Sequence, residues 1–552
     1  MKKWELINKE QKIIRQLADK EQTEKIIKIL LENRGIKTEK ERETFLTPQD
    51  PYTLTSKQVG IDPKQLERAV KRIQKAIKER QKIIVYGDYD SDGVCATAIM
   101  WETLWKLKAD ALPFIPTRDE GYGMKVEKLD EFKKEGVGLI ITVDNGIVSY
   151  SQTQHAKEIG LDMVITDHHL PGKGELEAFA VVHTTQLCGA GVSWFVANQL
   201  RKTDLDLVTT GTVTDLMPLV GINRAIVYHG LGHLQKTRRL GLQELFKAAA
   251  IVPEKIGTYE IGYIIGPRLN AAGRMEDPMD ALRLVCTPKD QQALDLAKKL
   301  DQQNRERQSL MEVMTLQAKE MWLKEDGKSK LIFVSSESWE HGIVGLVAGK
   351  LVEEFSRPAV VISWGKEYCR ASARSINGFN IVEAIRTCED FLEASGGHSM
   401  AAGFTVATDK LEQVQKKLIS LANQQLTEED LQPKIKIDLE LDFSSLTLEL
   451  YQAIKKLEPF GLGNYQPVFL TRGLRVIDAR TVGATGKHLK LNLADQKNSG
   501  SSAVIGAIGF GMGDLYQKLS PETEVDLVYT LEMDEWDGNK KLQLKVKDIK
   551  LI

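Results

Sequence analysis

The chain has 552 residues, of which 75 are basic and 77 are acidic, and its formal net charge is −2. Hydrophobic residues make up 42% and charged residues 28%, which is ordinary for globular proteins and excludes global disorder. At about 150 residues per domain, this length predicts three or four domains. The even charge balance excludes a protein that coats polyanions through bulk charge alone, but it is compatible with a local basic groove.

The sequence also indicates a cellular compartment. Residues 1–5 lead into charged sequence rather than an apolar stretch, so we expect no secretory signal. No apolar run approaches the roughly 18 residues that span a bilayer. The cysteines are widely spaced and include no CxxC pair, which argues against a disulfide framework and a zinc ribbon. We therefore expect a cytoplasmic protein that has no membrane partner and keeps its thiols reduced.

The first half of the chain shows the alternation of strand and helix patterns that is typical of an α/β domain. Residues 1–57 are charged and predicted to be helical. From residue 58, short apolar runs alternate with helical patterns, which is typical of a parallel sheet with helices on its faces. Asp62 and Pro63 suit the N-cap and first turn of a helix that runs to about residue 80. Another helix is expected at about 94–108 and strands at 82–86, 138–143, 161–166 and 179–182.

The second half changes character twice. Residues 289–326 contain neither Gly nor Pro and are rich in strong helix formers, which predicts a long helix that connects two lobes. A second α/β segment is expected at 328–428. From residue 429 to the end the pattern is strand-rich, which predicts a small β-barrel.

The densest chemical motif follows the strand at 82–86. Asp88, Asp90 and Asp92 alternate there and are followed by Gly93, which allows a tight backbone turn. At the carboxyl end of a strand, these side chains can converge where α/β sheets bind ligands. Unpaired, the anions would raise one another's pKa, and a divalent cation removes that conflict. The alternatives are a solvated acidic turn and a calcium-binding loop. A calcium loop of the EF-hand type is excluded, since its bidentate Glu is missing and a helix begins at that place instead.

The same residue types recur downstream. Two further strand ends and a later segment carry Asp144, Asp167, His168, His169 and Asp215. A single Asp after a strand is usually a cap or turn former, but the repetition indicates metal ligands. Mixed carboxylate and imidazole ligands suit Mn²⁺ better than Ca²⁺, and Mg²⁺ also fits. Five or six ligands exceed one open catalytic site, so the pattern favours two ions that share a bridging carboxylate.

In this order, the segments GDYDSDG, VDNG, DHH and TVTDLMPL resemble the four motifs of the DHH phosphoesterase superfamily. The later segments GPRLNAAGR, SARS and GGHSMAAG, with the terminal barrel, resemble the RecJ family of bacterial exonucleases. The resemblance covers nearly the whole chain from about residue 58. It implies a two-lobed α/β fold with a catalytic DHH domain at 58–288, a connecting helix at 289–327, a second α/β domain at 328–428 and an OB-fold at 429–552.

The resemblance also implies a role for each motif residue. It assigns Asp90 and Asp144 to one metal ion and Asp92, Asp144, His168 and Asp215 to the other, with Asp88 in or beside this set. Asp167 would orient the imidazoles and His169 would face the scissile phosphate. Two Mn²⁺ or Mg²⁺ ions would then activate a bridging water and clamp the phosphate for in-line attack. No covalent nucleophile is required.

An end-directed enzyme also needs to sense the strand's end. By resemblance, Arg118, Ser372 and Arg374 form a 5′-phosphate pocket, since guanidinium groups match phosphate geometry. Arg118 could equally form an ion pair with Asp119 or Glu120.

Two further sets of residues would contact the strand. Gly397 would let the backbone approach it and His398 would donate a hydrogen bond, although a buried His398 could instead satisfy a loop carbonyl. Arg268, Asn270 and Arg274 would line the nucleic-acid path, although salt bridges between the lobes would explain the arginines too.

The implied function is a single-stranded-DNA-specific exonuclease that acts 5′→3′ in DNA recombination and repair. We expect a monomer whose partners are single-stranded DNA, a single-strand-binding protein and a helicase. One alternative is a DHH phosphodiesterase for oligoribonucleotides or small phosphoesters, against which the strand-binding barrel argues. The other is a non-catalytic scaffold at the replication fork, which has no chemical reason to retain the ligand residues.

Overall fold

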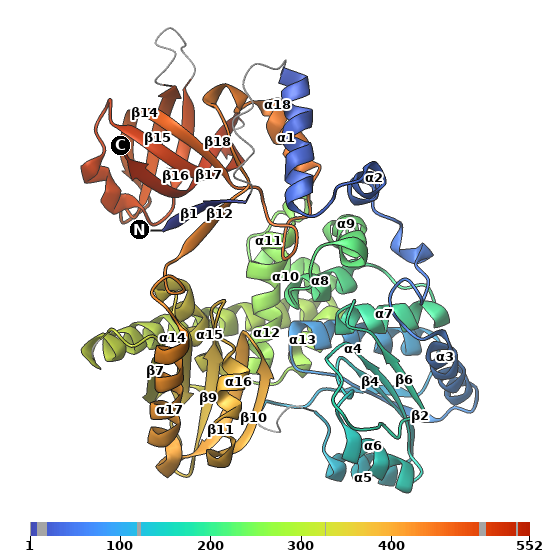
Figure 1. Ribbon diagram of the computed structural model, residues 1–552. Coiled ribbons are helices and arrows are strands. Elements are labelled where there is room, and N and C mark those ends of the chain that lie inside the picture. Colours follow the sequence, from blue (N-terminus) through green and yellow to red (C-terminus); the bar gives the residue numbers. More distant parts are fainter. Residues whose placement is uncertain (1, 8–18, 119–122, 326, 496–503, 537–538) are drawn as a thin grey trace. The chain divides into compact units, whose positions relative to one another are not determined.

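The computed structural model describes residues 2–7, 19–118, 123–325, 327–495, 504–536 and 539–552. The chain divides into two compact units (Figure 1). The α/β unit consists of Asp50–Met217 and Ala225–Gln432, and the barrel unit consists of Met1–Gln49, Pro218–Arg224 and Pro433–Ile552.

The first sheet of the α/β unit is parallel throughout and has the order β3-β2-β4-β5-β6. Its strands are β2 (Lys82–Tyr86), β3 (Ala111–Phe114), β4 (Val137–Val143), β5 (Asp162–Asp167) and β6 (Ala180–His183). The four strands predicted in this region are therefore confirmed. The strand β3 was not predicted. It contains Pro113, and the proline is tolerated because β3 is an edge strand.

Helices precede and follow these strands. The predicted helix after Asp62 is α3, and the Asp62 side chain accepts a hydrogen bond from the Lys64 backbone at 2.8 Å. The helix expected at about 94–108 begins three residues earlier, as α4. The α-helices between residues 63 and 286 are α3 (Pro63–Lys78), α4 (Ser91–Lys106), α5 (Val126–Lys134), α6 (Tyr150–Glu158), α7 (Gly189–Leu200), α8 (Asp206–Thr214), α9 (Gly221–Gln235), α10 (Leu240–Ala248), α11 (Thr258–Glu260), α12 (Gly266–Met275) and α13 (Met279–Cys286).

The predicted long helix is confirmed as α14 (Asp290–Glu325), whose 36 residues correspond to about 54 Å at 1.5 Å per residue. It is followed by a mixed sheet with the order β10-β11-β9-β8-β7. The elements of this part are β7 (Ile332–Ser336), α15 (His341–Phe355), β8 (Ala359–Ser363), β9 (Tyr368–Arg374), α16 (Ile381–Arg386), β10 (Leu392–His398), β11 (Ala401–Ala407) and α17 (Leu411–Gln425). The two-lobed α/β architecture expected from the sequence is therefore correct.

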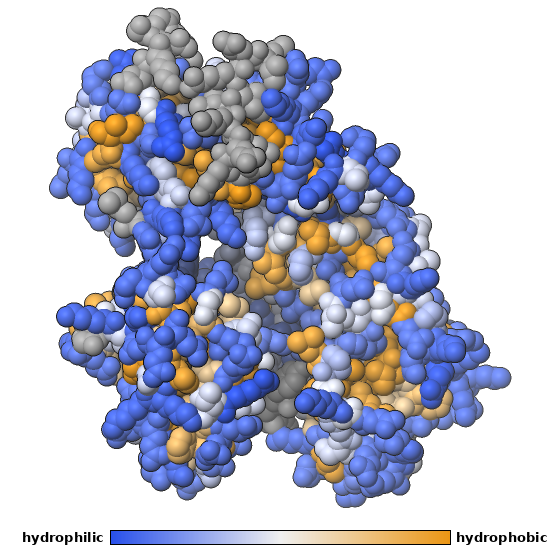
Figure 2. All heavy atoms as spheres, in the orientation of Figure 1, coloured by the Kyte–Doolittle hydropathy of each residue, from blue (hydrophilic) through white to orange (hydrophobic). Residues whose placement is uncertain are grey.

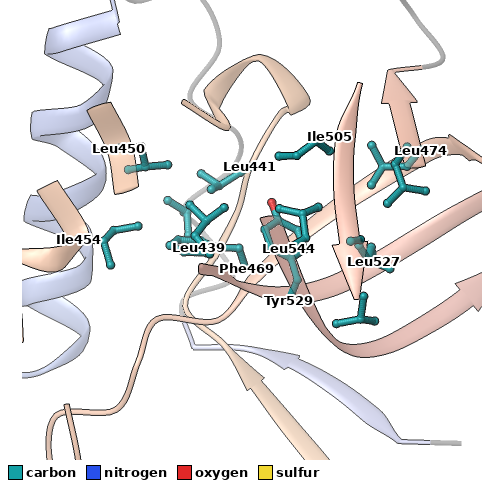
Figure 3. Close-up of a cluster of buried hydrophobic side chains, with 14 of the residues drawn as sticks. Leu439, Leu441, Leu450, Ile454, Phe469, Leu474, Ile505, Leu527, Tyr529 and Leu544 are labelled. Atoms are coloured by element: carbon teal, nitrogen blue, oxygen red, sulfur yellow. The ribbon is translucent and has the colours of Figure 1, made fainter. Parts of the chain in front are cut away.

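The barrel unit closes because β14 pairs with both β15 and β17, while β16 and β18 complete the ring. Its strands are β13 (Leu439–Glu440), β14 (Phe469–Val482), β15 (His488–Asp495), β16 (Ile505–Gly509), β17 (Glu524–Trp536) and β18 (Asn539–Leu551). Figure 3 shows the apolar interior, where Tyr529 lies close to Phe469 and bonds through its hydroxyl to Thr471 at 2.7 Å. The predicted terminal β-barrel is confirmed.

The first residues of the chain belong to this barrel unit. β1 (Lys3–Leu6) pairs in parallel with β12 (Lys434–Ile437), and α1 (Asp19–Asn33) packs against α18 (Leu448–Lys455), with α2 (Glu39–Leu46) following α1. Buried Arg224 contributes to the same unit by donating hydrogen bonds to the carbonyls of Phe45, Leu457 and Glu458.

Hydrophilic residues cover most of the face shown in Figure 2, and hydrophobic ones appear between them. In the part of the chain that the structure describes, no helix combines the length and apolar character needed to cross a membrane.

Candidate active site

The loop between β2 and α4 brings the first acidic motif to the carboxyl end of the sheet. Asp90 is the N-cap of α4, and its Oδ1 accepts a hydrogen bond from Gly93 N at 2.9 Å. Asp92 lies in the first turn, where a helix favours negative charge. Gly93 is required here, because a Cβ at this position would lie 2.5 Å from the Asp88 carbonyl oxygen. The capping geometry therefore fixes the acidic loop against the start of α4.

The first turn of α7 holds the Asp92 carboxylate in place and lies close to Asp144. Gly189 N donates to Asp92 Oδ2 at 2.7 Å, and Ala190 N donates to Asp92 Oδ1 at 3.0 Å. A Cβ on Gly189 would lie 2.2 Å from Asp144 Oδ1, and one on Gly211 would lie 2.3 Å from Asp92 Oδ1. These glycines were not predicted as part of the site; the available signals in the sequence were the CGAG segment at the start of a helix and the Gly four residues before Asp215.

The ligand-type residues form three overlapping groups, and the ligand atoms within each group all lie within 4.8 Å of one another. The groups are Asp88, Asp90 and Asp144; Asp92, His168 and Asp215; and Asp144, His168 and His169. Asp144 and His168 each belong to two groups, so the side chains predicted from four separate motifs lie around one centre.

Burial and mutual repulsion act on the carboxylates of this centre. Burial, together with the charge of Asp90, raises the pKa of Asp88 and of Asp92 to about 7. Burial, with Asp92 and Asp90, raises the pKa of Asp215 to about 9. For the same reasons the pKa of Asp144 lies well above its ordinary value. The arrangement costs free energy when all these groups are ionised, and a cation between them would offset that cost.

A buried acceptor atom also suits a cation. Asp144 is 2% exposed, and its Oδ1 accepts no hydrogen bond from any described residue, although His168 Nε2 lies 3.1 Å away. His168 Nδ1 lies 3.7 Å from Asp215 Oδ2. Burial and the neighbouring His169 lower the pKa of His168 to about 4, so its imidazole is neutral at physiological pH and can offer a lone pair. The donor set therefore fits a divalent cation.

Asp167 organises the DHH loop rather than the centre itself. Asp167 is 1% exposed. Its Oδ1 accepts hydrogen bonds from the backbone N–H of His168 at 2.6 Å and of His169 at 3.1 Å. Its Oδ2 accepts a hydrogen bond from Ile147 N at 2.8 Å. His169 Nδ1 lies 2.8 Å from the same Oδ1. Burial alone would lower the pKa of His169, but the bond to Asp167 outweighs it and the pKa is raised. His183 was not predicted as a site residue. Its Nε2 lies 2.7 Å from the His169 carbonyl oxygen, so a hydrogen bond from His183 fixes the backbone of the DHH loop.

The arginines predicted to bind phosphate are gathered in one electropositive region. Burial, together with the charges of Arg118, Arg307 and Arg374, lowers the pKa of Arg274 to about 10. Arg118 stacks over the Tyr89 ring at 4.4 Å, and its Nε donates to the Gly273 carbonyl at 3.3 Å. Like charges this close favour an anionic ligand. Asp119 and Glu120, the alternative partners of Arg118, lie outside the described residues.

The remaining predicted residues have distinct surroundings. Arg374 Nη1 donates to Ser372 Oγ at 3.1 Å, so these two residues of β9 lie together. His398 is exposed at the end of β10, which contradicts the alternative of a buried loop histidine, and Gly397 before it has φ +140°. Because its Cβ would lie 2.4 Å from the Ala401 carbonyl oxygen, only glycine fits there.

Residues of α12 connect the centre to the long helix. Asn270 Oδ1 accepts a hydrogen bond from Ser91 N at 2.7 Å, which places it beside the acidic loop. Arg268 forms an ion pair with Asp301 of the connecting helix α14 at 2.8 Å, so this pair is not the salt bridge between the lobes that was the alternative. Arg274 Nη1 donates to the Gly342 carbonyl at 3.0 Å.

Three family descriptions match the chain in the expected order: DHH family, N-terminal domain, at residues 82–215; DHHA1 domain at 328–424; and RecJ OB domain at 437–548. A Bacillus subtilis protein named "Single-stranded-DNA-specific exonuclease RecJ" is 36% identical over 562 residues, which cover 99% of this chain and 70% of the relative. The Escherichia coli protein of the same name is 28% identical, with 95% of each chain covered.

Among solved structures, the crystal structure of RecJ in complex with Mn²⁺ from Thermus thermophilus matches with a TM-score of 0.81 and 28% identity, covering 99% of this chain and 79% of that one. The corresponding Mg²⁺ complex matches with a TM-score of 0.76 and 26% identity, covering 99% and 78%. Sequence, fold and the order of the motifs agree, and the chain belongs to the RecJ family of DHH proteins.

Proposed function

We propose that this chain is a single-stranded-DNA-specific exonuclease that removes 5′-mononucleotides from the 5′ end in DNA recombination and repair. The observation that carries the proposal is the convergence of four motifs on one centre, in which Asp144 and His168 each belong to two ligand groups. The names of the relatives support the same activity.

We assign two Mn²⁺ or Mg²⁺ ions to this centre. Asp90 and Asp144 would hold one ion, and Asp92, Asp144, His168 and Asp215 the other, with Asp88 in or beside this set. Three observations support the assignment: Asp144 belongs to two ligand groups, its buried Oδ1 accepts no hydrogen bond from any described residue, and the carboxyl pKa values are raised. Ions of this kind, when bound, activate water and neutralise a phosphodiester.

The chain's own residues supply orientation and proton control. The neutral His168 offers a lone pair at the centre, while the Asp167 carboxylate fixes the His169 ring through Nδ1. His169 Nε2 lies on the other side of the ring from the bond to Asp167, and it would donate a hydrogen bond to a phosphate oxygen or to the leaving 3′ oxygen. Asp144, Asp167 and His169 are the residues on which catalysis depends.

The positive region supports recognition of the strand's 5′ end. Arg118, Ser372 and Arg374 would bind a terminal phosphate through forked guanidinium and hydroxyl donors. Further contacts to the strand are assigned to Gly397, His398, Arg268, Asn270 and Arg274. The closed barrel would also bind the single strand, as barrels of this type bind single strands in a groove.

We further assign domain boundaries and partners. The catalytic domain would span 58–288, the connecting helix 289–327, the second α/β domain 328–428 and the strand-binding domain 429–552, after an N-terminal extension at 1–57. The protein would act as a cytoplasmic monomer that receives its substrate from a helicase and a single-strand-binding protein. Light scattering of the purified chain tests the monomer directly.

The activity is tested by digesting single-stranded DNA and RNA, labelled at either end, with Mn²⁺, Mg²⁺ or chelator. We expect metal-dependent release of the 5′ label first from DNA, and no release by the Asp144→Ala variant, which stays folded. Release of the 3′ label first would overturn the polarity. Full metal-dependent activity of Asp144→Ala would overturn the two-metal assignment.

A further inference from the structure

Two tyrosines lie stacked on the surface of the α/β unit, outside the groups assigned above. Tyr259 belongs to α11, and Tyr263 belongs to the π-helical segment η3 (Ile261–Ile265). Their side chains are 61% and 71% exposed. The ring centroids are 5.0 Å apart and the ring planes differ by 27°, so the two rings are stacked on each other. Single exposed hydrophobic residues are normal, but an exposed aromatic pair in a stacked arrangement is a more specific feature.

The local sequence turns these rings outward. Ile261 and Ile265 alternate with the tyrosines and are fully buried. Gly266 packs so closely that a Cβ there would lie 2.5 Å from Thr214 Cγ2, and Gly262 lies over Val213 with a corresponding distance of 3.9 Å. The inner face of the segment is thus seated on the last turn of α8, and the tyrosines occupy the opposite face. A π-helical turn of this kind is rare and is often found at functional sites.

The segment lies between two elements of the active site. The helix beneath it, α8, ends in Asp215, which is its C-cap and one of the predicted metal ligands. The helix after it, α12, carries Asn270, which binds the start of α4, and Arg268, whose Nη1 donates to the Ile264 carbonyl at 2.8 Å. The stacked tyrosines are therefore attached to the frame that positions the metal centre.

We propose that Tyr259 and Tyr263 form a stacking platform for a nucleobase of the single strand, on the 3′ side of the bond that is cut. The inference rests on the proposed exonuclease function. Every base has an aromatic face, so stacking holds a strand without regard to its sequence, which suits an enzyme that degrades any sequence. Because the rings are already stacked, little side-chain freedom is lost when a base adds to the pair.

The test uses the full chain with both tyrosines replaced by alanine, and a matched variant with both replaced by phenylalanine. Tyr368→Ala is the control for loss of an exposed aromatic ring elsewhere, since Tyr368 is 49% exposed on β9. Dissociation constants are measured with fluorescent 5′-phosphorylated single strands in chelator, which prevents hydrolysis. A second set of strands carries one abasic position, which is moved stepwise from the 5′ end.

We expect the double alanine variant to bind about 5- to 150-fold more weakly, in line with the loss of one base–aromatic stack. The double phenylalanine variant and Tyr368→Ala should bind as the parent does. Among the abasic strands, we expect one position at which the missing base weakens binding to the parent chain but not to the double alanine variant. In that variant the tyrosines are already absent, so removal of the base that would stack on them costs no further affinity. Thermal midpoints should be equal, since both rings are exposed.

Equal affinities of the parent and the double alanine variant would overturn the proposal and indicate that the tyrosines contact a protein or solvent. The same holds if every abasic strand loses affinity equally for both proteins. These outcomes differ from a failure of the proposed function, in which the parent chain itself releases no 5′ nucleotide from single-stranded DNA.

Discussion

The metal-free protein should lose stability as the pH rises from 6.5 to 9, and Asp215 should account for much of the loss. Burial, with the charges of Asp92 and Asp90, raises its pKa from 3.8 to about 9 in the folded state. Such a group stabilises the folded state fully below the unfolded value, and that contribution is lost as the pH rises through the folded value. In this range the folded chain keeps a proton that the unfolded chain has already released.

The size of the effect follows from the same shift. Each pH unit in the range costs about 1.4 kcal/mol, so the free energy of unfolding should fall by on the order of 3 kcal/mol across it. His168 acts in the opposite direction, because burial and His169 lower its pKa from 6.5 to about 4. That contribution changes mainly below pH 6.5. Above it, His169 adds to the decline, because its bond to Asp167 raises its pKa in the folded state; the Asp215→Asn variant therefore isolates the part due to Asp215.

The assay is urea denaturation at several pH values, in chelator and with saturating Mn²⁺. In chelator we expect the decline described above, and with Mn²⁺ we expect it to disappear, because the cation binds the ionised carboxylates of the folded state. Asp215→Asn should make the decline in chelator clearly smaller, and the remainder is due to the other groups with raised pKa values, such as Asp144. The matched control is Asp206→Asn, which alters a buried carboxylate paired with Arg239 at 2.8 Å; it should lower stability but retain the pH dependence.

A stability in chelator that does not change between pH 6.5 and 9 would refute the reasoning. An unchanged decline in Asp215→Asn would refute the part assigned to this residue.

Three further predictions concern other parts of the chain. Gly189→Ala should lower the steady-state rate of DNA digestion by at least about 100-fold, because the methyl group would displace Asp144. The control variant Gly232→Ala should keep the parent rate, because, among the described residues, no atom beyond the adjoining turns of its own helix lies within 4 Å of the added methyl group. Arg374→Ala should raise KM for 5′-phosphorylated strands and have little effect on 5′-hydroxyl strands; equal effects on both would contradict the phosphate role. Arg224→Ala should lower the free energy of unfolding by about 3 kcal/mol or more, since buried carbonyls lose a charged donor, and denaturant titration measures this.

Much of the architecture could be predicted, because strands and helices depend on the residue pattern within one segment of the chain. Continuous apolar runs identified four strands of the parallel sheet, and the stretch without Gly or Pro identified α14. The residue types of the metal centre were equally local, since Asp and His follow the ends of successive parallel strands, and such ends meet at one edge of a sheet.

The sequence by itself therefore determined which side chains lie at the metal centre and which strands and helices carry them. The tertiary structure alone decided how they are held: the α7 amides on Asp92, the close approach of Gly189 to Asp144, and the outer support from His183. It also decided that residues 3–6 pair with a strand more than 400 residues away. These contacts depend on the distances between elements that are far apart in the chain, and no periodicity or spacing within one segment encodes such distances.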